Sequence, residues 1–445
     1  MREVKVYNSM TNKLEVLKTL KENEVSMYVC GPTVYSYVHI GNMRPVITFD
    51  TLKRFLTYIG YNVVHISNIT DVDDKIINQA IKENTTEEVI ANKYAENYFG
   101  CCDKLNVIRP TFVPRVTKTM DLIIDFVAKL VEKGYAYEVD GDVYFRVNMI
   151  KDYGKLANFK IEDLKAGARI EENSKKESPL DFALWKKTDI GIKWDSPWGK
   201  GRPGWHTECV VMINDHYENA RIDIHGGGFD LKFPHHENEI AQANAMYDNN
   251  IATYWMHNGF ININNEKMSK SIGNVVLAKD LIAKFDGMVI RLVMLNSYYR
   301  APLNFTEEGI LAAQKEYEKI YRALKQADLK LSLAHKDVNV AVNEDLMNPF
   351  LDSMAMDLNT PNALTELYRA IKELNTVIRQ NDLDKLAITF KTVLDMLYVL
   401  GLDYKRMELT QEDEELFTSW NEAKKNKDFI KADEYRKVLI EKQLI

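Results

Sequence analysis

The chain has 445 residues, of which 46% are hydrophobic and 28% are charged, and its formal net charge is −7 at pH 7. This composition is typical of soluble globular domains, and the length suggests about three of them. The chain has no apolar run long enough to cross a bilayer, and its start, MREVKVYNSM, lacks the apolar core of a signal peptide. Four cysteines are too few for a disulfide framework. We therefore expect a cytoplasmic protein without a membrane partner, in which any special cysteine is metal-bound or catalytic. The negative charge does not exclude a nucleic acid, because such binding depends on local basic patches.

The first third of the chain alternates strand and helix patterns. The expected elements are a strand at 25–30, a helix at 43–58, a strand at 61–67 and a helix over 71–84. Strand, helix and strand in this order, with buried strands, predict a right-handed parallel unit. Ligands of such sheets bind beyond the carboxyl ends of the strands, and Cys30 and His39 fall there.

The remaining chain predicts an insertion and then a helical region. Mixed strand and turn signals follow residue 116, and the parallel pattern resumes with RIDIHGGGFD. After residue 305 the pattern is helical, with Thr306 and Thr360 as expected N-caps and an apolar stripe that ends at Leu400-Gly401. The predicted fold is an α/β Rossmann-type parallel nucleotide-binding catalytic domain with an insertion, followed by an α-helical bundle. Its segments are the first catalytic half at 1–115, the insertion at 116–200, the second half at 201–262, a loop region at 263–305 and helices at 306–445.

Two short motifs point to phosphate chemistry. His39-Ile40-Gly41-Asn42 lies at a strand-to-helix junction, where a glycine lets a ligand approach and the helix start favours phosphate. The segment EKMSKSIGN (266–274) places Lys267 and Lys270 on a loop, where two ammonium groups suit a triphosphate. Alone, a four-residue match arises by chance and a lysine pair is usually a solvated surface. Together, in this order across an α/β pattern, they predict an ATP site.

A third group of residues has the chemistry of metal ligands. In FPHHENEIAQAN, His235 and Glu239 stand four residues apart and so share one helix face. Cys209 is a candidate third ligand and Cys30 a fourth, and all four side chains are accepted by zinc. The alternative is that the two cysteines are small buried hydrophobes and the other two a surface pair. The spacing alone leaves both readings open, and we assign no role to Cys101-Cys102.

With these motifs the sequence resembles the cysteinyl-tRNA synthetases, a family of class I aminoacyl-tRNA synthetases. The matching segments, in chain order, are MYVCGPTVY, HIGN, NITDVDDKII, LKAGARI, SPWGKGRPGWHTEC, DIHGGGFDLKFPHHENEIAQ, YWMHNGF, EKMSKSIGN and YYRAPLNFTEE. The cysteine-containing segments separate this family from its class I relatives. One position departs from the usual pattern, because Asn42 stands where the family's first signature commonly ends in histidine.

The resemblance implies ATP-dependent ligation of L-cysteine to tRNA(Cys) through a cysteinyl-adenylate. It implies one zinc ion per chain that selects the substrate thiol, magnesium bound with ATP, stem contacts from 263–305 and anticodon contacts from 306–445. We expect a monomer. The implied catalytic residues are His39, Asn42, Lys267 and Lys270, and the ATP site adds Gly41 and Ser269. The implied substrate residues are Gly31, Thr70, Trp205, His225 and Asp230, and the implied zinc ligands are Cys30, Cys209, His235 and Glu239.

The zinc has a physical rationale of its own. Cysteine and serine are near-isosteres, which an apolar pocket discriminates by only a few kcal/mol. A metal that accepts the substrate thiolate favours the softer sulfur directly.

Several of these residues have simpler alternatives. Trp205 could serve only as core packing, and Thr70 and Asp71 could only cap the following helix. We expect His206 and His236 to make structural hydrogen bonds.

Two rival functions remain at this stage. One is a cysteine ligase of the same fold that passes the activated cysteine to an amino-sugar. The helical region argues against it, since a small acceptor needs no anticodon reader. The other is a non-catalytic zinc-binding RNA-interaction module, which has no reason to keep His39, Lys267 and Lys270.

Overall fold

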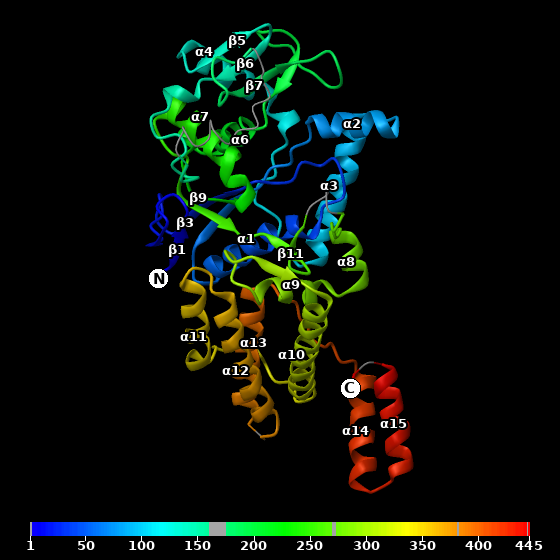
Figure 1. Ribbon diagram of the computed structural model, residues 1–445. Coiled ribbons are helices and arrows are strands. Elements are labelled where there is room, and N and C mark those ends of the chain that lie inside the picture. The colour runs from blue at the N-terminus through cyan, green and yellow to red at the C-terminus, as the bar shows by residue number, and fades with distance from the viewer. Residues whose placement is uncertain (1, 160–174, 269–272, 381, 443) are drawn as a thin grey trace. The chain divides into compact units, whose positions relative to one another are not determined.

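The computed structural model describes residues 2–159, 175–268, 273–380, 382–442 and 444–445. The chain divides into two compact units (Figure 1). The first unit contains Met1–Gly287, Tyr299–Phe305 and Ala355–Leu358, and the second contains Met288–Tyr298, Thr306–Met354 and Asn359–Ile445.

The centre of the first unit is a four-stranded parallel sheet, which confirms the predicted α/β class. Its strand order is β10 (Ala252–Asn258), β9 (Ile222–Gly228), β3 (Glu24–Val29) and β4 (Asn62–Ile66). Helix α1 (Ile40–Tyr58) connects β3 to β4 and begins at Ile40 rather than at the expected residue 43. The earlier start is stabilised by Asn42, whose Oδ1 accepts the N–H of His39 at 3.1 Å.

Helix α1 lies very close to the sheet because β9 ends in three glycines. A Cβ atom at Gly226 would lie 2.2 Å from the ring of Phe49, which belongs to α1. A side chain at residue 226 would therefore push α1 away from the sheet. This close packing places the first turn of α1 at the carboxyl ends of the strands, where the predicted site lies.

Smaller elements surround the central sheet. The strands outside it are a hairpin of β1 (Lys5–Asn8) and β2 (Lys13–Val16), an antiparallel sheet of β5 (Ala136–Val139), β6 (Asp142–Phe145), β7 (Phe182–Lys187) and β8 (Gly201–Pro203), and a three-stranded sheet of β11 (Ile261–Ile263), β12 (Glu266–Lys267) and β13 (Leu303–Phe305). The further α-helices are α2 (Asp74–Glu83), α3 (Glu87–Lys104), α4 (Met120–Glu132), α6 (Glu208–His216), α7 (Glu237–Tyr247) and α8 (Ala278–Lys284). The short helical turns are η1 (Val116–Lys118), η2 (Val147–Met149), η3 (Glu218–Ala220), η4 (Phe229–Leu231) and η5 (Lys232–His236).

One hydrophobic core joins the central sheet to the antiparallel sheet. It includes Tyr28 and Ile66 of the central sheet, Val127 of α4 and Trp185 of β7. Cys209 and the residues after it in α6 belong to the same core. The core therefore fixes α6 against the central sheet, and with it the backbone of one predicted metal ligand.

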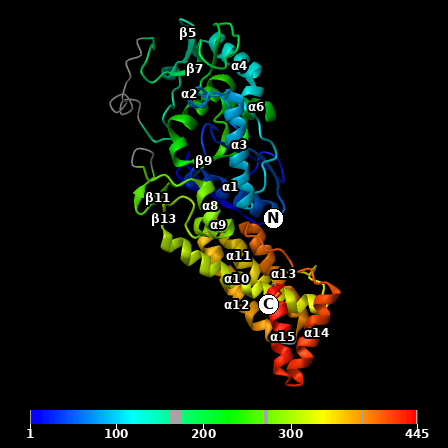
Figure 2. The ribbon, with the colours of Figure 1, turned by 90° about the vertical axis from the view of Figure 1, so that its right-hand side faces the viewer.

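The second unit is helical, as the sequence predicts. Its helices are α9 (Gly287–Leu295), α10 (Glu307–Leu333), α11 (Glu344–Ala355), α12 (Thr360–Ile378), α13 (Leu383–Leu400), α14 (Gln411–Lys425) and α15 (Phe429–Glu441). Helices α10, α12 and α13 lie side by side (Figure 2).

The helix-end signals were mostly read correctly. Thr306 caps α10, and Gly401 ends α13 in the left-handed conformation. The predicted cap at Thr360 is wrong by one residue, because the side chain of Asn359 accepts the N–H of Asn362. Thr360 instead donates its hydroxyl to the carbonyl of Leu295 at 2.7 Å.

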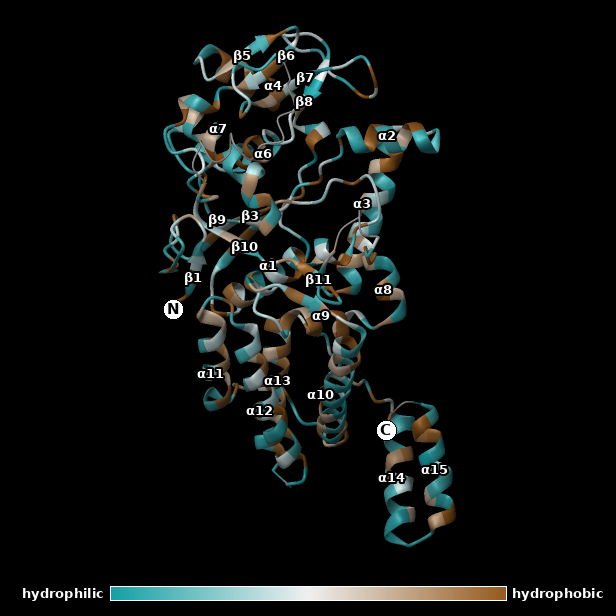
Figure 3. Cartoon of the chain, in the orientation of Figure 1, coloured by the Kyte–Doolittle hydropathy of each residue, from teal (hydrophilic) through white to brown (hydrophobic). Residues whose placement is uncertain are grey.

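Helices α14 and α15 form a separate hairpin of mixed hydropathy (Figure 3). Phe429 and Ile430, at the start of α15, are 70% and 77% exposed. Among the described residues, no helix is both long and apolar enough to cross a membrane.

Candidate active site and metal-ligating cluster

A cavity of about 750 Å³ opens at the carboxyl ends of the central strands. Residues that follow β3, β9 and β10 line it, together with the first turns of α1 and the segment after β12. This is the edge at which the parallel pattern predicts a ligand.

The start of α1 forms one wall of the cavity through His39, Gly41 and Asn42. A Cβ atom at Gly41 would lie 2.8 Å from Cε of Met268 and 3.0 Å from Nδ1 of His39. Only glycine fits here without displacing these side chains. The N–H groups of the first helical turn point toward the cavity end of α1, which favours a bound anion.

The predicted lysine loop is attached to the same wall at its far end. Ile40 donates its N–H to the carbonyl of Val276 at 2.9 Å, and Ala278 donates to Val38 at 2.9 Å. At its near end the backbone of Lys267 lies in β12, which pairs with β11, and Met268 lines the cavity. Ser269 and Lys270 lie outside the described residues, as does the side chain of Lys267.

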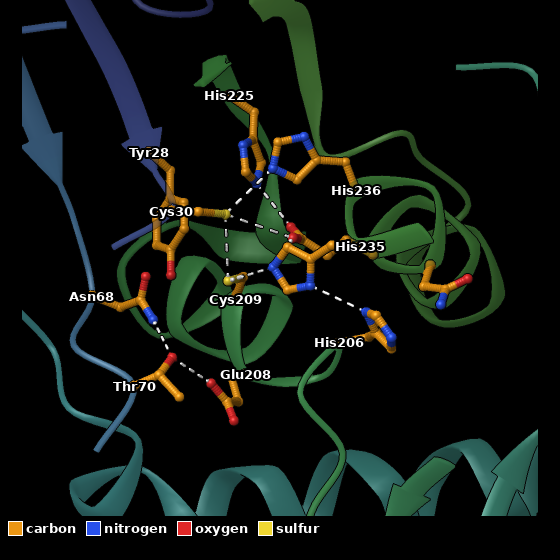
Figure 4. A network of polar contacts seen from close by, with 12 residues as sticks. Tyr28, Cys30, Asn68, Thr70, His206, Glu208, Cys209, His225, His235 and His236 are labelled. Atoms are coloured by element: carbon orange, nitrogen blue, oxygen red, sulfur yellow. Dashed lines mark hydrogen bonds and ion pairs between the residues drawn. The ribbon is translucent and has the colours of Figure 1, made fainter. Parts of the chain in front are cut away.

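The four predicted metal ligands converge beside this cavity, which Cys30 lines, and Figure 4 shows three of them, Cys30, Cys209 and His235. Sγ of Cys30 lies 3.8 Å from Sγ of Cys209 and 3.9 Å from Oε1 of Glu239. Nε2 of His235 lies 3.5 Å from Sγ of Cys209 and 2.9 Å from Oε1 of Glu239. His235 lies in η5 just before α7, while Glu239 lies in α7 itself. The alternative of an exposed surface pair is wrong, because both side chains are buried.

Burial and mutual contacts shift the pKa values of all four residues of the cluster. Burial raises the pKa of Cys30 well above its usual value, aided by its hydrogen bond to Cys209. The hydrogen bond from Cys30 lowers the pKa of Cys209 to about 6. Burial alone would lower the pKa of His235, but Glu239 and Cys209 raise it to about 10. Against its own burial, Glu239 has its pKa held well below the usual value by His225 and His235. The set thus offers two sulfurs, a nitrogen and an oxygen to a metal, and a metal that binds there displaces the protons of the imidazole and the thiol.

Each imidazole of the cluster has an outer partner that orients it. Nδ1 of His235 lies 3.1 Å from Nδ1 of His206, and the ring of Trp205 stacks on His235 at 4.2 Å. Nε2 of His236 lies 3.3 Å from Sγ of Cys30, and its Nδ1 lies 2.9 Å from His257. Such partners fix the ring orientation of metal-ligating histidines. The prediction that His206 and His236 make structural hydrogen bonds agrees with these contacts.

A second set of possible metal ligands overlaps the first. It contains Cys30, His225, His236 and Glu239, and it shares two side chains with the predicted set. It offers one thiolate instead of two. In the described structure Nδ1 of His225 is buried without a hydrogen-bond partner, so this imidazole lacks the outer hydrogen bond that metal-ligating histidines usually have. The predicted set is therefore the better metal site.

The predicted substrate residues fall into two groups. Gly31, Trp205 and Asp230 line the cavity. Trp205 is 40% exposed, so the alternative that it only packs in the core is wrong. Thr70 and His225 are buried beside the cluster instead of lining the cavity.

The capping alternative for Thr70 and Asp71 is also wrong. Asp73 caps α2, since its side chain accepts the N–H of Lys75. Asp71 instead accepts the N–H and the hydroxyl of Thr117, at 3.0 and 2.7 Å.

Three buried polar residues near the site escaped the sequence interpretation. Arg44 donates to the carbonyls of Gly259, Phe260 and Ala301 and so ties α1 to the segment after β10. Asn68 and Glu208 hydrogen-bond to Thr70. Glu208 and Asn68 fall inside segments that resemble the family, SPWGKGRPGWHTEC and NITDVDDKII, but no motif or spacing singles out either residue.

Comparisons with known proteins agree with this geometry. The family model described as the tRNA synthetases class I (C) catalytic domain matches residues 16–315, and the DALR domain matches residues 349–405. The cysteine–tRNA ligase of Oceanobacillus iheyensis is 47% identical over 453 aligned residues, which cover 99% of this chain and 97% of the relative. The chain belongs to the cysteine–tRNA ligase family. It is therefore a class I aminoacyl-tRNA synthetase, as the sequence motifs predict.

Other members of the cysteine–tRNA ligase family match equally completely. The cysteine–tRNA ligase of Bacillus cereus is 46% identical over 451 residues, covering 99% of this chain and 97% of the relative. That of Acholeplasma laidlawii is 44% identical over 442 residues, covering 99% of this chain and all of the relative.

Solved structures of other class I synthetases share the fold. Methionyl-tRNA synthetase of Mycobacterium tuberculosis, in complex with methionyl-adenylate, matches with a TM-score of 0.58 at 14% identity, covering 85% of this chain and 89% of that one. A ternary LeuRS–tRNA–LeuAMS complex of Agrobacterium radiobacter K84 gives a TM-score of 0.62 at 11% identity, covering 86% and 85%. At these identities the match supports the fold of this family member and nothing finer.

Proposed function

We propose that this chain ligates L-cysteine to tRNA(Cys) with ATP, through a cysteinyl-adenylate, and that a zinc ion selects the substrate thiol. The observation that carries the proposal is the convergence of two thiols, an imidazole and a carboxylate beside the cavity. The family relatives that bear the name cysteine–tRNA ligase support the substrate assignment.

Two separations within the cluster fit a tetrahedral metal, whereas Nε2 of His235 and Oε1 of Glu239, at 2.9 Å, are in ion-pair contact and move apart when a metal binds between them. Two thiolates bound at about 2.3 Å in tetrahedral geometry stand about 3.8 Å apart, and a thiolate and an imidazole about 3.5 Å apart. The corresponding separations are 3.8 Å for the two sulfurs and 3.5 Å for Cys209 and His235. Two sulfurs with one nitrogen and one oxygen favour zinc over magnesium or calcium. When bound, zinc supplies an affinity for thiolate that a serine hydroxyl does not match.

The residues of the chain provide positioning for the first reaction. The carboxylate of the amino acid attacks the α-phosphate of ATP in line, and pyrophosphate leaves. The nucleophile is already ionised, so no general base is needed. We assign His39, Gly41 and Asn42 to the phosphates, which the first turn of α1 brings to the cavity wall. Lys267, Ser269 and Lys270 complete the ATP site in this proposal, with magnesium bound to ATP.

The cysteine would lie between the cluster and the phosphates. Gly31, Trp205 and Asp230 line the cavity on this side, and the carboxylate of Asp230 can accept the amino group of the substrate. We assign Thr70 and His225 to the inner wall, since both are buried beside the cluster.

We assign the second reaction, in which the terminal ribose hydroxyl attacks the activated carbonyl, to tRNA bound along 263–305 and 306–445. The DALR match within the helical region supports a tRNA acceptor over an amino-sugar. We propose that the enzyme acts as a monomer in the cytoplasm.

Pyrophosphate exchange and aminoacylation together test the proposal. The enzyme should exchange pyrophosphate into ATP with cysteine and not with serine, and should then transfer cysteine to tRNA(Cys). Exchange without transfer to tRNA would favour the amino-sugar ligase. No cysteine-dependent exchange by zinc-loaded protein would contradict the proposal.

The lysine loop is tested by Lys270→Ala. A lysine that acts on charge developing in the transition state should lower kcat for exchange about 100-fold or more, with little change in cysteine affinity. Lys284→Ala, at the end of α8, is the control. If both variants exchange at the rate of the unmodified enzyme, the loop lysine is only a surface charge.

A further inference from the structure

The two cysteines of the metal set come from distant segments. Cys30 follows β3, whereas Cys209 is the second residue of α6. Strand β3 pairs with β4 and β9, so the sheet ladder does not include α6. The hydrophobic core holds α6 against the sheet, but apolar packing is not directional, and metal coordination tolerates deviations of only about 0.2 Å. A directional link between the segments that carry the two sulfurs would set their separation within a narrower range.

A buried chain of hydrogen bonds connects the neighbours of the two cysteines. The N–H of Gly31, which follows Cys30, donates to Oδ1 of Asn68 at 2.9 Å. Nδ2 of Asn68 donates to the hydroxyl of Thr70 at 3.1 Å. That hydroxyl donates to Oε2 of Glu208, which precedes Cys209, at 2.8 Å. Figure 4 shows Asn68, Thr70 and Glu208 in line below the sulfurs.

We propose that Asn68 and Glu208 are positioning residues that act through Gly31 and Thr70 to fix the separation of the Cys30 and Cys209 sulfurs. The hydrogen-bond chain and the contact between the sulfurs form a closed ring. The inference rests on the proposed function, because it presumes that these sulfurs bind a metal.

We call this ring of hydrogen bonds the clamp, and three observations indicate that it is rigid. Asn68, Thr70 and Glu208 are each only 2% exposed, so water cannot replace a lost partner at low cost. A Cβ atom at Gly31 would lie 1.6 Å from the carbonyl oxygen of Asn68, so the two backbones are in close contact. The N–H of Thr70 also donates to the carbonyl of Pro32 at 3.2 Å. The clamp thus holds the loop after β3 from two directions.

The hydroxyl of Thr70 is the central link because it bonds to both of its neighbours in the chain of hydrogen bonds. It accepts from Asn68 and donates to Glu208. Removing this one hydroxyl therefore breaks both bonds, which makes Thr70 the position at which the inference is tested.

The test measures zinc affinity without cysteine or ATP, so that direct substrate contacts play no part. Thr70→Val keeps the side-chain volume and removes both hydrogen bonds, and Glu208→Ala removes the last link. Each should lower zinc affinity by 10- to 100-fold, the range found for outer partners of metal ligands. Thr70→Ser and Glu208→Gln keep the required hydroxyl and acceptor oxygen, and should bind zinc within about threefold of the unmodified chain.

Cobalt substitution reports the thiolates directly, through its sulfur-to-metal absorption band. That band should weaken or shift in Thr70→Val and stay unchanged in Thr70→Ser. Thr389→Val is the matched control, since Thr389 is a fully buried threonine of α13 whose hydroxyl also has a single acceptor, the carbonyl of Lys385. It should lose some thermal stability and no zinc affinity.

The proposal is overturned if Thr70→Val binds zinc with full affinity and an unchanged cobalt spectrum. It is also overturned if Thr70→Ser and Glu208→Gln lose as much affinity as the disruptive variants, because general destabilisation then explains both. Should Glu208→Ala fail to fold, Thr70→Val and Asn68→Ala decide the outcome. Failure of the proposed function is distinct, since the unmodified enzyme would then bind no zinc.

Discussion

Two fully buried carboxylates occupy opposite kinds of environment in the two units. In the second unit, Asp328 of α10 accepts hydrogen bonds from the guanidinium of Arg406, the hydroxyl of Tyr404 and the N–H of Met407. In the first unit, Glu239 faces imidazole nitrogens and the sulfur of Cys30. Both carboxylates are 0% exposed.

The difference between them is in what surrounds the oxygens. Donors surround Asp328, so its charge is satisfied by the protein and it fastens residues 404–407 to α10. The neighbours of Glu239 are imidazoles and a thiol, which can lose a proton and bind a metal, whereas the guanidinium and the amide beside Asp328 cannot. A buried carboxylate among groups that cannot bind a metal is a structural fastening, whereas one among potential metal ligands indicates a cation site.

The largest expected effect follows from neutralising Glu239, the carboxylate among potential metal ligands. Glu239→Gln removes the charge and one ligand at nearly constant shape, and we expect zinc affinity to fall by more than about 100-fold, beyond the range of outer partners. Cysteine-dependent exchange should fall with it. Metal analysis and exchange on the same sample provide the measurement. Full zinc content in this variant would show that the carboxylate is not a ligand, and the comparison would fail.

Neutralising Asp328 should instead lower the free energy of unfolding of the second unit. Asp328→Ala leaves the N–H of Met407, the hydroxyl of Tyr404 and the half-exposed guanidinium of Arg406 without their acceptor, which costs about 1–3 kcal/mol. We expect denaturant unfolding of the second unit to shift accordingly. Zinc content and cysteine-dependent exchange should remain at the level of the unmodified enzyme. A loss of zinc in Asp328→Ala would mean that the two carboxylates do not differ in the way described.

How far the sequence alone leads can be judged from the same residues. Ligand chemistry and the spacing of His235 and Glu239 made Cys30, Cys209, His235 and Glu239 candidates, but the spacing left a surface pair open, and the family resemblance grouped the four. The alternation of strands and helices also predicted the central sheet. These signals lie in residue type and local spacing.

Asn68, Glu208 and Asp328 could not be found in this way. Their partners lie far along the chain, as for Thr70 and Glu208 or Asp328 and Arg406, and no periodicity links them. The start of α1 was misplaced because the contact between Asn42 and His39 extends the helix beyond the apolar pattern. The cap of α12 was assigned to Thr360 because Asn359 and Thr360 are both good capping residues.

The smallest effect concerns a third carboxylate that lies near the surface. Asp413 of α14 accepts from Lys442 at 2.8 Å and from the hydroxyl of Thr410 at 2.7 Å, and these bonds lower the pKa of Asp413 to about 2. Because the folded pKa is below the usual 3.8, this contribution is present above that pH and is lost as the pH falls toward about 2. The partially exposed ammonium limits it to under about 1 kcal/mol.

Hydrogen exchange of α15 measures this effect. The protection of the α15 backbone amides against exchange should fall slightly as the solution is acidified. In Asp413→Asn the same amides should show the lower protection already at neutral pH. An unchanged pH profile in Asp413→Asn would show that another carboxylate is responsible.

The central claim is that the sulfur pair holds a metal that selects the substrate thiol. Its most direct test is the ratio of kcat/KM for cysteine to that for serine in ATP–pyrophosphate exchange, with bound zinc measured on the same samples. The unmodified enzyme should contain close to one zinc per chain. Cys209→Ser should lose zinc and lower the ratio by more than about 100-fold, with little change in ATP affinity. Cys101→Ser, at a buried position in α3 outside the cluster, should change neither quantity. Full zinc and full discrimination in Cys209→Ser would contradict the account, and thiol recognition would then have to come from the shape of the pocket around Trp205.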